Sequence, residues 1–117
     1  PSGNGVIAAG AAVAAAVAFA VGRLLNTGPS LAMLEQQSVP LDQALRNSKP
    51  TVIEFYADWC EVCRELVPTE ISVEEQYRSD INFVMLNIEN SKWAPEVNEF
   101  NVGGIPHFVF MDGSNKP

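Results

Sequence analysis

Cys60 and Cys63 are the residues whose type and spacing point most directly to chemistry in this chain of 117 residues. They are its only cysteines, and two thiols at this spacing can close a small disulfide ring or stand together at one end of a helix. Two cysteines and one histidine cannot supply the four ligands of a structural zinc site, and a disulfide framework would need more cysteines. The pair therefore predicts thiol–disulfide redox chemistry, without a metal, flavin or nucleotide cofactor.

The positions of the two cysteines predict different roles for them. A thiolate, rather than a thiol, attacks a disulfide, and the N-terminus of a helix stabilises a thiolate. Cys60 lies where a predicted strand gives way to a predicted helix, and Cys63 lies one turn further in, where it should be more buried. We therefore expect Cys60 to be the attacking thiol and Cys63 to be the resolving thiol.

The elements that must position this pair follow an α/β pattern over residues 31–117. Apolar runs predict three strands, at residues 52–57, 81–88 and 107–111, the first of them buried on both faces. Apolar periodicity and breaker residues predict three helices, at residues 39–46, 60–77 and 94–100. Residues 31–34 fit either a short strand or a turn of helix.

The N-terminal part of the chain is uncharged as far as residue 22 and apolar or small at every position from residue 6. Its length is close to the ~20 residues that a spanning helix needs, so we expect a transmembrane helix at residues 1–25 and a linker at residues 26–30. A cleaved signal peptide is the alternative, because Ala18-Phe19-Ala20 has the small residues of a cleavage site.

Small residues recur at every fourth position of this N-terminal segment. Such spacing lets helix backbones approach closely, so transmembrane helices of a larger membrane complex are possible partners. The residues are Gly10, Ala14, Ala18 and Gly22. The net charge is −7, and all 14 acidic residues lie between positions 35 and 112. This acidic balance argues against nucleic acid as a partner.

The surroundings of the cysteines resemble thioredoxins from about residue 41 to residue 115. The matching features are residues 56–64, Pro68 five positions after the second cysteine, Leu86-Asn87-Ile88-Glu89 and Gly104-Ile105-Pro106. The resemblance implies a thioredoxin-like fold in which Pro106 belongs to a cis-proline loop that offers its backbone to an extended substrate. Thioredoxins continue with a further strand and a C-terminal helix that this chain lacks, which predicts an unpaired sheet edge and an uncovered face.

A closer resemblance is to the membrane-anchored thioredoxin-like proteins of thylakoids, found in chloroplasts and cyanobacteria. Residues 57–65, residues 83–87, Lys92-Trp93 and residues 105–108 carry it. It implies a single-pass thylakoid membrane protein whose lumenal domain reduces disulfides of target proteins during cytochrome b6f assembly. A membrane thiol carrier would then supply the electrons.

Glu54 lies within the first predicted strand, six positions before Cys60. Thioredoxins have a buried acid there that passes protons to the resolving cysteine, so the resemblance implies the same role toward Cys63. A lysine often accompanies that acid, but Met85 occupies the corresponding position, so burial without a counter-charge should raise the pKa of Glu54. A surface-facing glutamate at a strand edge is the alternative.

Four residues are expected to contact substrate: Trp59, Ile105, Pro106 and His107. Trp59 would present an apolar surface beside Cys60. His107 could hydrogen-bond a substrate or tune the thiol, or it could be a partly exposed residue without a role.

Glu61 and Val62 replace the Gly-Pro usual between the cysteines of thioredoxins. A carboxylate next to Cys60 disfavours its thiolate while Arg64 favours it, so Glu61 either makes the pair more reducing or only influences the choice of partner. Two alternative functions remain open. One is a structural or assembly subunit of a photosynthetic membrane complex, and the other is a periplasmic thioredoxin for cytochrome c maturation, anchored in a bacterial inner membrane.

Overall fold

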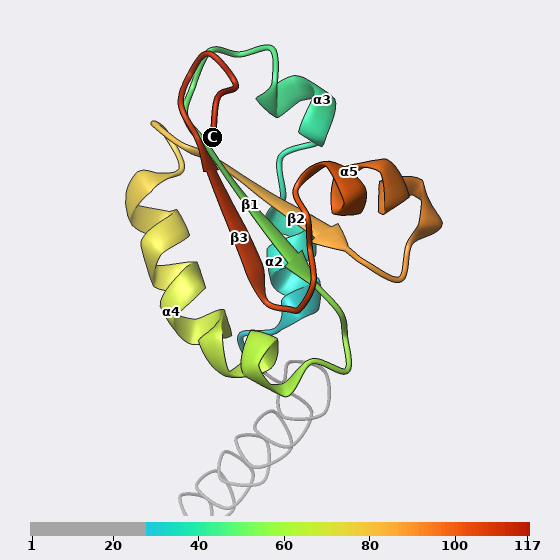
Figure 1. Ribbon diagram of the computed structural model, residues 1–117. Helices are drawn as coiled ribbons and strands as arrows, with labels where there is room; N and C mark the ends of the chain where they lie inside the picture. The colour runs from blue at the N-terminus through green and yellow to red at the C-terminus, as the bar shows by residue number, and fades with distance from the viewer. Residues whose placement is uncertain (1–27) are drawn as a thin grey trace, which may run out of the picture.

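A computed structural model describes residues 28–117, which form a three-stranded sheet covered by helices (Figure 1). Strand β1 (Thr51–Tyr56) is central, parallel to β2 (Asn82–Asn87) and antiparallel to β3 (His107–Met111). Helix α4 (Glu61–Tyr77) connects the two parallel strands. The predicted α/β pattern is confirmed, and β1 is buried on both faces as its apolar run indicated.

Three shorter helices and one 3₁₀ turn complete the described part of the chain. They are α2 (Leu31–Gln37), α3 (Leu41–Ala44), η1 (Ser91–Trp93) and α5 (Ala94–Glu99). The undecided segment at residues 31–34 is helical: Ser30 caps α2 by accepting a hydrogen bond from the backbone nitrogen of Met33 at 3.2 Å. Leu31 and Leu34 face the core from this helix.

The helix predicted at residues 39–46 was too long at both ends. The backbone nitrogen of Val39 donates to the carbonyl oxygen of Phe83 at 2.9 Å, so Val39 pairs with β2 instead of starting the helix. Helix α3 begins only after Pro40, which has no N–H group to donate.

Two apolar clusters lie on opposite faces of the sheet. The first holds both cysteines, packed with residues of α2, β1 and α4: Leu31, Leu34, Tyr56, Val67 and Ile71. The second lies under α3 and α5 and includes Ala44, Ile53, Phe55, Val84, Leu86, Val109 and Met111. The redox pair is therefore built into the end of a packed core.

On the face that α4 covers, strand β3 leaves two aromatic side chains exposed. Phe108 is 36% and Phe110 is 66% exposed, and their rings stack with centroids 6.4 Å apart. Between them and α4 lies a groove of about 370 Å³. Within residues 28–117, β3 pairs only with β1, so its other edge is unpaired among the described residues.

The transmembrane helix predicted at residues 1–25 lies outside the described residues, as does the start of the linker. From residue 28 onward, no helix has the length and apolar character needed to cross a membrane.

Candidate active site

Cys60 is the N-cap residue of α4, as its position in the sequence predicted. Strand β1 ends at Tyr56, and a tight turn, closed by a 3.1 Å hydrogen bond from the Cys60 nitrogen to the Ala57 carbonyl oxygen, leads into the helix. The Cys60 sulfur accepts a hydrogen bond from the backbone nitrogen of Cys63 at 3.1 Å. A donor aimed at the sulfur from the positive end of the helix stabilises a thiolate at Cys60.

Cys60 and Cys63 are joined by a disulfide, with their Cα atoms 5.2 Å apart. Cys60 is 5% exposed and Cys63 is completely buried, which confirms that the second cysteine is the more buried. Of the two cysteines only Cys60 keeps any solvent exposure, so a partner would approach the disulfide from the Cys60 side.

A groove of about 500 Å³ lies beside Trp59, the residue before Cys60, and is lined by apolar side chains and two glycines. Its lining consists of Trp59, Ile88, Val97, Val102, Gly103, Gly104 and Ile105. Ile105 also packs against the cluster that contains both cysteines, and the peptide bond between Ile105 and Pro106 is cis. Three of the predicted substrate-contacting residues thus lie together at the disulfide end of the molecule.

Trp59 is 61% exposed, so its ring forms an apolar surface next to Cys60. Its indole nitrogen donates a hydrogen bond to a carboxylate oxygen of Glu89, which holds the ring in place. Sequence reasoning missed this role of Glu89, although Glu89 closes one of the motifs shared with thioredoxins. Residues 30 positions apart meet here, and the motif itself did not indicate the contact.

His107 packs edge-on against the ring of Phe55, with ring centroids 5.8 Å apart and planes at 77°. Phe55 belongs to the cluster under α3 and α5, so the His107 ring lies on the opposite face of the sheet from Glu54. The histidine is partly buried directly after Pro106. Its expected role toward substrate stays a prediction.

Glu54 is only 3% exposed, so the alternative of a surface-facing residue was wrong. On the central strand it lies between Met85 of β2 and Phe108 of β3. Burial, with the nearby carboxyl groups of Glu70 and Glu74, raises the pKa of Glu54 to about 9. The predicted rise in the Glu54 pKa is confirmed, and Met85 offers no counter-charge.

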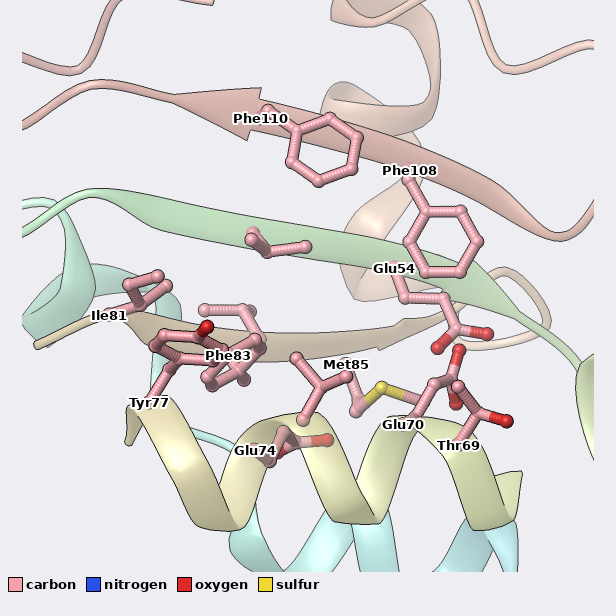
Figure 2. Close-up of a pocket in the computed structure, with 13 residues that line it drawn as sticks. Glu54, Thr69, Glu70, Glu74, Tyr77, Ile81, Phe83, Met85, Phe108 and Phe110 are labelled. Carbon is pink, nitrogen blue, oxygen red and sulfur yellow. The ribbon is translucent and has the colours of Figure 1, made fainter. Parts of the chain in front are cut away.

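Glu70 and Glu74 are two acidic neighbours of Glu54 that sequence reasoning missed. Glu70 reaches from α4 toward Glu54 of β1, and Glu74, one turn further along the helix, lines the same groove (Figure 2). Burial and the charge of Glu70 raise the pKa of Glu74 to about 7. A signal was present: Glu70 and Glu74 follow Cys63 by seven and eleven positions, which places them on the same helix face. Across residues 28–117, no group of three or more His, Cys, Asp and Glu side chains is arranged to hold a metal ion.

The fold and the cysteine pair define a thioredoxin-fold domain of the thiol–disulfide oxidoreductase class. The thioredoxin family matches residues 32–117, and the chain belongs to that family.

Several relatives are similar over most of this chain. The thioredoxin-like protein HCF164 of Arabidopsis thaliana, described as chloroplastic, is 54% identical over 100 residues, which are 86% of this chain and 38% of that protein. A homologue of the thiol:disulfide interchange protein TxlA from Synechocystis is 44% identical over 102 residues, covering 86% of this chain and 57% of that protein. The chain thus spans between about two fifths and three fifths of these relatives.

Among solved structures, thioredoxin O1 of Arabidopsis thaliana in its oxidised state superposes with a TM-score of 0.55. The sequences are 26% identical, and the match covers 65% of this chain and 68% of that one. The thioredoxin-like fold expected from the sequence is confirmed.

Proposed function

We propose that this protein reduces disulfide bonds of target proteins by dithiol–disulfide exchange. The observation that carries the proposal is the Cys60–Cys63 disulfide at the N-terminus of α4, with Cys60 as the less buried cysteine and a groove lined by apolar side chains next to Trp59. The family membership and the name of the TxlA relative, a thiol:disulfide interchange protein, support the same reaction.

The reduced protein acts in two steps. The Cys60 thiolate attacks one sulfur of the target disulfide, forming a mixed disulfide and releasing the other target sulfur as a thiolate. Cys63 then loses its proton and attacks the Cys60 sulfur. The bond between Cys60 and the target breaks, its electron pair leaves with the target sulfur, and the disulfide between Cys60 and Cys63 is restored.

Glu54 receives the proton of Cys63 in the second step. Trp59, Ile105 and Pro106 hold the target segment in the groove, and His107 contacts it from the start of β3. The lining of the groove supports this placement, since extended peptides bind apolar grooves next to exposed backbone.

The proposed location is the thylakoid membrane, with residues 1–25 as the single transmembrane helix and the thioredoxin domain in the lumen. The similarity to a chloroplastic protein and to cyanobacterial TxlA proteins supports it. A membrane thiol carrier would re-reduce the disulfide, and the target proteins would include those needed for cytochrome b6f assembly. In a bacterium without thylakoids, the corresponding place is the periplasmic side of the inner membrane.

Two measurements on the full chain test the reaction. The reduced protein should reduce insulin disulfides in the presence of dithiothreitol, and Cys60→Ser should abolish this activity. A redox titration should return a potential well below the ~ −120 mV of the strong oxidant DsbA. A potential near that of DsbA, or full activity in Cys60→Ser, would refute the proposed function.

A further inference from the structure

The carboxyl groups of Glu54 and Glu70 face one another in the groove between α4 and the sheet (Figure 2). One carboxylate oxygen of Glu54 and both of Glu70 are buried and have no hydrogen-bond donor among the described residues. Burying carboxylate oxygens without a hydrogen-bond donor destabilises the fold, unless one carboxyl group is protonated and donates a hydrogen bond to the other.

The groove around the Glu54–Glu70 pair offers no positive charge to compensate it. Strands β2 and β3 face it with Phe83, Met85, Phe108 and Phe110, none of which carries a charge. Helix α4 contributes Thr69, Glu74 and Tyr77 to the groove, and the positive charge of Arg78 acts on Glu74. No cation therefore compensates Glu54 or Glu70 from any of the three elements packed around them.

Two carboxylates at such close range cannot both be ionised in apolar surroundings, so one of them keeps a proton. The pKa of Glu70 is raised by burial and lowered by its hydrogen bond with Glu54, whereas the same bond raises the pKa of Glu54.

We propose that Glu70 is the proton partner of Glu54, so that the two carboxyl groups share one proton and one negative charge while the protein acts on a disulfide. The inference rests on the proposed function and adds a second residue to its proton path. Glu70 contacts neither the substrate nor a cysteine sulfur; it is a positioning residue that acts through Glu54.

The shared proton resolves a difficulty in the reaction. If Glu54 acted alone, its carboxyl group would already be protonated at neutral pH and could not accept the proton of Cys63. The pair can take it: Glu54 accepts the proton from Cys63 while passing its own to Glu70. The negative charge of Glu70 disappears as the target thiolate leaves with its negative charge, so the charge and the protons balance.

The test is to follow the carboxyl carbons of Glu54 and Glu70 by NMR as a function of pH in the full chain. In Glu70→Gln the facing charge is gone and the amide can donate to an ionised Glu54, so the pKa of Glu54 should fall by about one unit or more, a tenfold change in proton affinity. Glu75→Gln removes a charge from the exposed side of the same helix and should leave the Glu54 titration unchanged. A smaller fall in Glu70→Gln, or an equal fall in both variants, would overturn the proposal.

A rate measurement separates this inference from the proposed function. In the wild type, the rate at which target is released from the mixed disulfide should rise with pH over the range in which the Glu54–Glu70 pair loses the first of its two protons. In Glu70→Gln the rise should occur at higher pH, at the pKa of Glu54 alone, although that pKa has fallen. An unchanged pH profile would overturn the shared relay. The proposed function is tested separately, by the loss of disulfide reduction in Cys60→Ser. The NMR titration reports on the Glu54–Glu70 pair even in a protein without activity.

Discussion

Replacing Glu54 by glutamine should stabilise the protein at neutral pH, because the native fold holds a carboxyl group that the unfolded chain would ionise. The pKa of Glu54 is raised from 4.5 to about 9 on folding. Between these values the folded state binds more protons than the unfolded state, so the free energy of unfolding falls as the pH rises. This contribution to stability is fully present below about pH 4.5 and is lost by about pH 9.

The size of the effect follows from the same values. Between pH 4.5 and pH 7 the free energy of unfolding of the wild type falls by about 1.4 kcal/mol per pH unit, or about 3 kcal/mol in all. Glu54→Gln does not undergo this loss of stability. Urea unfolding of the full chain, followed by tryptophan fluorescence, should show near-equal stability of wild type and variant at about pH 4 and a widening advantage of the variant up to about pH 9. Glu75→Gln serves as the control for an exposed charge. A stability difference between Glu54→Gln and wild type that does not change with pH would refute the reasoning.

Two further predictions concern the substrate groove and the core. Trp59→Ala should lower kcat/KM for a protein disulfide about tenfold by removing contact surface beside Cys60, with little change in stability, because the side chain is 61% exposed. Phe110→Ala, which removes an aromatic ring that is 66% exposed in the other groove, should leave kcat/KM unchanged, and an equal loss in both variants would contradict the placement of the substrate. Asn82→Ala should destabilise the protein by about 2–3 kcal/mol in urea unfolding, because the buried amide donates to the Ala44 carbonyl oxygen at 3.2 Å and to Thr51 Oγ1 at 3.0 Å. The exposed Asn98→Ala should change stability by less than about 0.5 kcal/mol, and a similarly small change in Asn82→Ala would show that these bonds contribute little.

The parts of the site that the sequence predicted depend on local pattern. Cys60 at the start of a helix and Cys63 one turn inside it follow from the strand-to-helix change around them. The burial of Glu54 follows from its place within a continuous apolar run. Even the undecided first helix carried a local signal, because Ser30 is a typical N-cap residue.

The parts that the sequence did not predict depend on contacts between distant segments. Helix α3 starts later than the apolar pattern predicted because the backbone of Val39 donates a hydrogen bond to Phe83. Phe83 lies on β2, which is far from α3 in the sequence. Glu70 meets Glu54 only because α4 crosses the sheet at one particular rotation. Periodicity could place Glu70 on the inner face of α4, but not opposite a given residue of β1.

The most direct test of the central claim is to map the mixed disulfide. Reduced Cys63→Ser, as the full chain, should react with a disulfide-bonded target and stay covalently attached to it, and mass spectrometry should find the target on Cys60. Cys60→Ser, which keeps only the buried thiol, should trap little or none. Attachment of the target through Cys63 in Cys60→Ser at a comparable yield, or no trapping in Cys63→Ser, would contradict the account.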